Sequence, residues 1–186
     1  MSVSETKRKI LEALWEAEKP LKPKEVAQIT GLGTASLTMH LLGLKRTGHV
    51  STPEPRCYSV TEKGKEALGI PKIDRTKARE ILSRVGVEKA FHFYTGINQY
   101  LGTYASSLAE FCDIIRKIDP RSVEFHLQRR DFESWFLGLG DIELAKRTNA
   151  LMTKKAGVPG ERLREQVYEA VKSRCVELER VSQAAH

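Results

Sequence analysis

Apolar residues in the first part of the chain recur at three- and four-residue steps, the spacing of helices with one buried face. Ser4 precedes the first such run and can cap a helix with its hydroxyl. Pro23 suits the first turn of a second helix over 23–30, which the run Gly31-Leu32-Gly33 ends. The face that we expect the first helix to bury consists of Ile10, Leu11, Leu14 and Trp15.

A third helix is predicted directly after the Gly31-Leu32-Gly33 break. Thr34 can cap it through its hydroxyl. Gly48 ends it, because glycine adopts a left-handed terminal conformation at the lowest cost. Leu37, Leu41 and Leu44 share one face, so the opposite face of this helix is expected to remain exposed.

A β-hairpin and a short closing helix are predicted over 49–68. Extended runs over 49–52 and 57–60 flank a turn at Pro53-Glu54-Pro55. Thr61 can then cap a helix that continues through Leu68. The predicted order is therefore three helices, a hairpin and a closing helix.

The stretch from Pro23 to Leu68 resembles the winged helix-turn-helix domains of prokaryotic and archaeal transcription regulators. Their recurring ending after the wing matches Tyr58-x-Val60-Thr61-x-x-Gly64-x-x-Ala67-Leu68. The resemblance covers about the first two fifths of the chain. It implies a three-helix core with a small β-wing that binds double-stranded DNA and regulates transcription.

In such a domain the helix over 34–46 enters the major groove and its exposed residues reach the bases. None of those residues makes the bidentate contact that arginine gives guanine or asparagine gives adenine, so we expect phosphate contacts to dominate the affinity. The residues expected to contact DNA are Lys22, Lys24, Thr34, Ala35, Ser36, Thr38, Met39, His40, Lys45, Arg46 and Arg56.

The rest of the chain predicts a second, helical domain. Ile70-Pro71-Lys72-Ile73-Asp74 is typical of a linker, since proline disfavours helix in the preceding residue. We therefore expect a winged helix over 1–70, a linker over 71–78, with Thr76 able to cap the helix that follows, and a C-terminal domain over 79–186.

The aromatic and glycine-rich run over 91–104 fits either a hairpin or a bent loop. Helix-start signals follow at Ser107, Asp119, Asp131 and Asp141, and a last helix from Pro159 carries the apolar stripe Leu163, Val167, Val171, Cys175 and Leu178.

Four motifs in this second half resemble a family of archaeal proteins that has no assigned activity. The resemblance supplies a domain type and no catalytic residues. The motifs are Ser107-Leu108-x-Glu110-Phe111, Ser122-Val123-Glu124-Phe125-His126, Arg130-Asp131-Phe132-Glu133-x-Trp135 and Gly140-Asp141-x-Glu143-Leu144-Ala145.

Composition narrows the expectations only modestly. The net charge is +7, and residues 1–75 carry 13 lysines and arginines against 9 acids, a net +4 that mildly favours a polyanionic partner. The three cysteines lie far apart in sequence without metal-ligand spacing, which favours reduced thiols over disulfides or a zinc site. We expect a cytoplasmic protein, because no apolar run is long enough to span a membrane and the N-terminus lacks a secretory pattern.

The second half contains histidines and carboxylates that have the chemistry for metal binding or acid–base work: His92, Glu124, His126, Asp131 and Glu133. Glu124 and His126 are two residues apart, so on a helix they point in different directions, and no His-x-x-x-His or Glu-x-x-His pair occurs. We therefore expect structural roles for these residues, with no enzyme activity, metal or cofactor. A ligand pocket among the aromatic residues is an alternative that the sequence leaves open.

The leading hypothesis is a homodimeric transcription regulator with a small-molecule or protein effector at the C-terminal domain. The alternatives are an interaction protein whose winged helix contacts protein partners, and an enzyme housed in the C-terminal domain.

Overall fold

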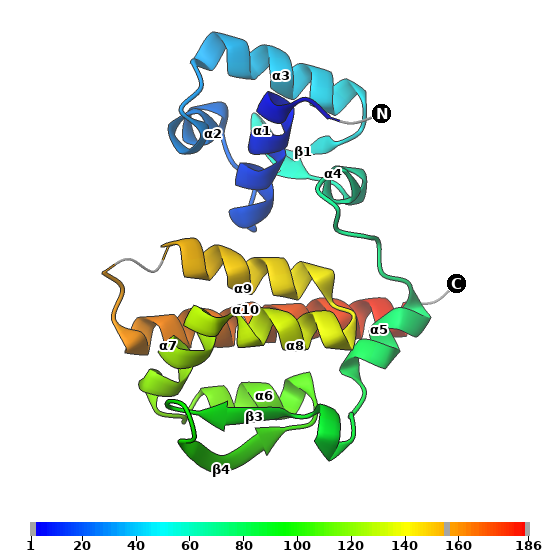
Figure 1. Cartoon of the computed structure of the whole chain (residues 1–186). Helices are drawn as coiled ribbons and strands as arrows, with labels where there is room; N and C mark the ends of the chain where they lie inside the picture. Colours follow the sequence, from blue (N-terminus) through cyan, green and yellow to red (C-terminus); the bar gives the residue numbers. More distant parts are fainter. Residues whose placement is uncertain (1–2, 155–156, 185–186) are drawn as a thin grey trace. The chain divides into compact units, whose positions relative to one another are not determined.

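The chain folds into two compact units, each with its own hydrophobic core. The computed structural model describes residues 3–154 and 157–184, and these are mainly helical. The units are Met1–Lys72 and Ile73–His186 (Figure 1). No helix within the described ranges is both long and apolar enough to cross a membrane.

The first unit contains four helices and one hairpin in the described residues. Leu37, Leu41 and Leu44 are fully buried beneath the third helix, together with Ile10 and Leu11 of the first. The elements are α1 (Glu5–Glu16), α2 (Pro23–Thr30), α3 (Thr34–Arg46), β1 (Val50–Glu54), β2 (Cys57–Val60) and α4 (Glu62–Ala67).

A short extended segment between α1 and α2 joins the hairpin. The Leu21 amide donates to the Tyr58 carbonyl at 2.9 Å, and the Tyr58 amide donates to the Leu21 carbonyl at 2.8 Å. This antiparallel bridge was not expected from the sequence, because a single paired residue has no periodicity. The bridge connects the segment before α2 to the second strand of the hairpin.

Two expected caps are wrong, and the third is confirmed. Ser4 is the N-cap residue of α1, but its side chain makes no capping hydrogen bond. Gly33, in extended conformation, is the N-cap of α3, so Thr34 is already helical and its carbonyl accepts the Thr38 hydroxyl at 2.8 Å. Thr61 does cap α4, because its hydroxyl accepts the Gly64 amide at 3.2 Å.

The hairpin turn lies later than expected. Strand β1 extends through Glu54, which pairs with Cys57, so the turn consists of Pro55 and Arg56. The register shifts between Ser51 and Glu54. This irregularity accommodates Pro53, which has no amide to donate to the ladder. Arg56 takes a left-handed φ of 62° at the tip.

The second unit is built around its last helix. That helix, α10, packs against α5, α6, α7 and α9. The run over 91–104 is a hairpin, which settles the open alternative. The elements are α5 (Arg75–Leu82), a 3-10 turn η1 (Val87–Lys89), β3 (Phe91–Tyr94), β4 (Tyr100–Ala105), α6 (Leu108–Ile115), α7 (Pro120–Arg129), α8 (Asp131–Leu139), α9 (Ile142–Lys154) and α10 (Gly160–Gln183).

Helix α5 begins earlier than expected. The Asp74 carboxylate accepts the Lys77 amide at 2.8 Å and so caps the helix in place of Thr76. An aspartate is a stronger N-cap than a threonine, and it comes first in the chain. Residues 75–78, expected to belong to the linker, therefore form the first turn of α5.

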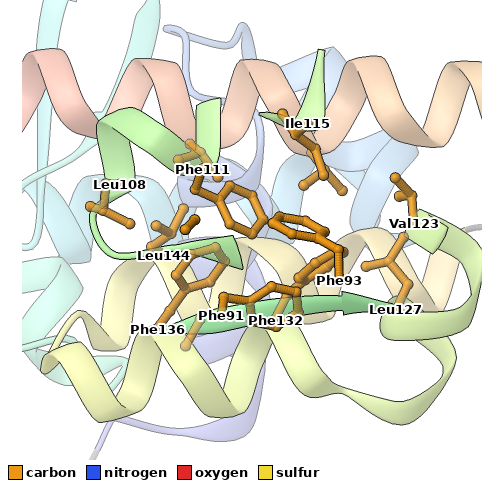
Figure 2. Close-up of a cluster of buried hydrophobic side chains, with 14 of the residues drawn as sticks. Phe91, Phe93, Leu108, Phe111, Ile115, Val123, Leu127, Phe132, Phe136 and Leu144 are labelled. Carbon is orange, nitrogen blue, oxygen red and sulfur yellow. The ribbon is translucent and has the colours of Figure 1, made fainter. Parts of the chain in front are cut away.

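Phenylalanine side chains fill the centre of the second core. Phe91 and Phe93 from β3 meet Phe111 from α6, with ring centroids 4.9–5.6 Å apart, and Phe132 and Phe136 of α8 complete the cluster (Figure 2). Edge-to-face pairs of this kind add to the free energy of burial. The aromatic run of β3 is thus mainly a structural feature.

The apolar stripe of α10 is buried within its own unit. Leu163, Val167, Val171 and Leu178 are each at most 3% exposed. Since α5, α6, α7 and α9 cover this helix, the stripe packs on the core of its own unit, and the predicted apolar periodicity is confirmed.

Two cysteines that are distant in sequence, Cys112 of α6 and Cys175 of α10, are neighbours across the contact of these two helices. Their interaction lowers the pKa of Cys175, whereas the same interaction and then burial raise the pKa of Cys112. Their distance in sequence concealed the contact, because it depends on helix packing alone.

A buried ionic cluster joins α9 to α10. The Arg174 guanidinium donates to both carboxylate oxygens of Asp141, at 2.9 and 3.1 Å, and to Glu143 at 2.8 Å. Glu177 accepts from Arg174 at 2.9 Å and also from Arg147, which bridges to Glu143. Asp141 also caps α9, as expected, by accepting the Leu144 amide. Arg174, although it occupies a buried position beside the apolar stripe, was not predicted as a core residue.

Replacing Arg174 by methionine is expected to destabilise the second unit by about 3–5 kcal/mol, because Asp141 and Glu143 would be left buried without their partner. Urea unfolding of the full chain measures the change. Arg180→Met, which removes an exposed arginine from the same helix, is the matched control and should cost within about 0.5 kcal/mol. Equal stability of the two variants would contradict a structural role for the cluster.

Candidate functional site

Helix α3 carries a continuous exposed stripe on the side opposite its buried leucines. Met39 is 75% exposed and Leu42 is 55% exposed, so two large apolar side chains lie on this face. Three- and four-residue steps place them in line with Thr38 and with the exposed Lys45 and Arg46. We call the set Ala35, Thr38, Met39, Leu42, Lys45 and Arg46 the α3 stripe.

The other residues expected to contact DNA lie around this helix or away from it. Thr34 and Ser36 are exposed in its first turn, and His40 is half-buried. Arg56 is exposed at the hairpin tip. Lys22 and Lys24 are exposed at the start of α2, just after the Leu21–Tyr58 bridge, so they do not belong to the α3 stripe.

Positive charge gathers at the C-terminal end of α3. The pKa of His49 lies below its ordinary value, first because of burial and then because of the charges of Lys63 and Lys7. Lys63 donates to the Thr47 carbonyl at 2.8 Å, which satisfies the end of α3. Lys7 and Lys63 were not predicted as site residues, because they come from α1 and α4 and only the fold brings them near His49.

The α3 stripe combines a hydroxyl, two large apolar side chains and two cationic side chains. The Thr38 hydroxyl donates to the Thr34 carbonyl at 2.8 Å, so toward a partner it acts as an acceptor. Met39 and Leu42 supply apolar contact, and Lys45 and Arg46 supply charge. This surface can bind a polyanion with apolar groups exposed in a groove, such as thymine methyl groups.

In the second unit, His126 is held on both sides by the protein. Its Nε2 accepts the Tyr94 amide at 2.9 Å, and its Nδ1 lies 2.8 Å from an Asp131 carboxylate oxygen. Nδ1 therefore carries the proton and donates it to Asp131. Burial lowers the pKa of His126 despite the opposing effect of Asp131.

The prediction that Asp131 caps a helix is wrong. Arg130 is the N-cap of α8, and the Asp131 side chain accepts hydrogen bonds from His126 and Arg129.

The remaining candidates for metal or acid–base chemistry do not converge. His92 contacts the Tyr100 hydroxyl and the Val87 carbonyl, whereas Glu133 lies 3.6 Å from Arg130. Glu124 is half-buried on α7, one residue from Phe125. In the described ranges no three histidine, cysteine or acidic residues are placed to hold a metal ion.

The motif residues of the second half make contacts within the unit. The Ser107 hydroxyl caps α6 by accepting the Glu110 amide, and the Glu110 carboxylate accepts the Ser106 amide at 2.8 Å. The Trp135 indole donates to the Lys89 carbonyl at 2.8 Å. Together with His126 and Asp141, these contacts give the motifs a structural explanation.

Comparisons of the chain with protein-family models, with curated proteins and with solved structures give no match. The two family resemblances therefore remain predictions from the motifs.

The His126 contacts predict lower stability in mild acid. The pKa of His126 is lower in the folded state than in the unfolded state. The stability that neutral His126 contributes is therefore fully present above the unfolded-state pKa of about 6.5 and is lost as the pH falls below it. Between about pH 6.5 and the folded-state pKa, the unfolding free energy should fall by up to about 1.4 kcal/mol per unit. Urea unfolding across this window measures it.

His126→Gln should reduce this pH dependence, since glutamine does not titrate. His49→Gln, in the first unit, is the control and should leave the pH dependence of the second unit unchanged. The assignment would be wrong if the pH dependence of the second unit persisted unchanged in His126→Gln.

Proposed function

We propose that the first unit is a winged helix that binds double-stranded DNA, with α3 as its recognition helix. The observation that carries the proposal is the α3 stripe, an exposed helix face with two large apolar side chains flanked by Lys45 and Arg46. Helix α3 has 13 residues and is about 20 Å long. The diameter of an α-helix fits the width and depth of the major groove.

The order of elements supports a winged helix. A helix, a bridging residue, two further helices and an antiparallel hairpin follow one another. The single Leu21–Tyr58 bridge joins the segment before α2 to this two-stranded hairpin. In this proposal the hairpin is the wing, and Arg56 at its tip contacts the phosphate backbone. Glu54, beside it, limits how closely the wing approaches phosphate.

The second unit then serves transcription regulation as an effector or partner-binding domain. A second candidate function is protein binding by the same helix, and the exposure of Met39 and Leu42 favours it. Protein interfaces are enriched in methionine and apolar anchors. The charges of Lys45 and Arg46 at the end of the stripe favour DNA binding, since both side chains can neutralise phosphates of a polyanion.

Duplex binding is expected to depend on salt and on Lys45 and Arg46. Replacing both by alanine should weaken binding to all sequences alike and reduce the slope of log affinity against log salt by about 1.8, because two phosphate contacts are lost. Fluorescence anisotropy with a labelled duplex of mixed sequence, titrated at several salt concentrations, gives both quantities.

The matched control is Arg8→Ala with Lys9→Ala. This adjacent basic pair on α1 is exposed and paired with Glu12 and Glu5 of the same helix. The Arg8→Ala, Lys9→Ala double variant loses the same charge as the Lys45, Arg46 double variant, and its salt slope should change by less. Absence of duplex binding by the wild-type protein at low salt would reject DNA in favour of the protein-binding candidate.

A homodimer is the expected DNA-binding form, because one recognition helix per chain reads one half-site and pairing multiplies affinity. Light scattering should report about twice the chain mass of 21.0 kDa. A duplex with two sites about 34 Å apart should bind more tightly than one with a single site. A mass near that of one chain, with equal affinity for both duplexes, would contradict the dimer.

A further inference from the structure

A cavity of about 540 Å³ lies between the β3–β4 hairpin and the end of α7. Its walls come from β3, from the turn between β3 and β4, from α7 and from the first residue of α8. The volume falls in the range of small-molecule sites. All of these elements belong to the second unit.

Aromatic and aliphatic side chains make up much of the lining. Phe91 and Phe125 lie on opposite elements, β3 and α7, and Ile97 from the hairpin turn is exposed at 77%. His126 lines the cavity as well, but both of its ring nitrogens are already hydrogen-bonded, to the Tyr94 amide and to Asp131. The histidine is therefore a fixed part of the wall and no base for a bound molecule.

Three of the polar side chains that line the cavity carry donors available to a ligand. Arg129 uses Nε for Asp131, at 3.3 Å, and its guanidinium lies 5.3 Å from the centre of the Phe125 ring. In the described part of the chain, no hydrogen-bond partner is present for its two terminal nitrogens, for the Tyr94 hydroxyl or for the Asn98 side chain. Two of these three side chains donate from nitrogen, and the third from a hydroxyl.

We infer that this cavity binds a small aromatic carboxylate. The aromatic body would lie against Phe91 and Phe125, and the carboxylate would accept hydrogen bonds from Arg129, Tyr94 and Asn98. A planar carboxylate matches the two terminal nitrogens of a guanidinium. The Phe125 contact holds that guanidinium in a defined position.

One acid, Asp131, also lines the cavity and would repel an anion. One of its oxygens already accepts from His126 and from Arg129, and this leaves the two terminal nitrogens of Arg129 available to a ligand. An aromatic amine is the competing ligand class, since it would use the second Asp131 oxygen. The terminal nitrogens of Arg129 can donate but cannot accept hydrogen bonds, which favours the carboxylate.

The test compares three indoles of nearly equal size, differing in the terminal group: indole-3-acetate, indole-3-ethanol and tryptamine. Isothermal titration of the full chain should show that indole-3-acetate binds with a Kd of about 0.1–1 mM and at least about tenfold more tightly than the other two. Arg129→Gln should weaken indole-3-acetate by at least about tenfold and leave indole-3-ethanol unchanged.

Arg130→Gln is the matched control, because it removes the same charge one residue away, outside the cavity lining. It should leave indole-3-acetate binding unchanged. Tyr94→Phe removes only a hydroxyl and keeps the ring, so it tests the site even if Arg129→Gln unfolds; it should weaken indole-3-acetate and not indole-3-ethanol. The inference would be overturned if tryptamine bound more tightly than indole-3-acetate, or if indole-3-acetate and indole-3-ethanol bound equally. It would also be overturned if Arg129→Gln and Arg130→Gln weakened binding equally, or if no indole bound at about 5 mM.

Discussion

Leu37, Leu41 and Leu44 are fully buried beneath α3, and this one-sided burial determines what the rest of the helix can do. Each leucine removed from water contributes about 1.5–3 kcal/mol, so the helix cannot rotate without a large loss of stability. The opposite face is consequently held outward, and Met39, Leu42, Lys45 and Arg46 lie on it. A rigidly presented helix face is the physical requirement for insertion into a DNA groove.

The second unit adds buried polar contacts to its apolar core. Arg174 and Asp141 connect α10 to the start of α9, and His126 connects α7 to the Tyr94 amide of β3. Each contact satisfies groups that would otherwise be costly to bury. The His126 contact also positions the hairpin against the end of α7, and the proposed carboxylate cavity lies between these two elements.

The sequence predicted features that depend on neighbouring residues and missed those that depend on the fold. Pro23 at a first turn and Thr61 as a cap act within one helical turn, and both were predicted correctly. The Leu21–Tyr58 bridge, the Cys112–Cys175 contact and the bonds of Arg174 join residues distant in sequence, and no spacing rule indicates them. In the candidate site, helical periodicity correctly predicted which side chains of α3 are exposed, whereas Lys22 and Lys24 lie on another helix, at the start of α2.

The central claim is that the α3 stripe contacts duplex DNA, and nuclear magnetic resonance of the labelled full chain tests it most directly. On titration with a duplex of mixed sequence, amide shifts should concentrate in Thr34–Arg46 and at Arg56 and should diminish as salt is added. Absence of shifts in α3, or shifts confined to other helices, would contradict the claim.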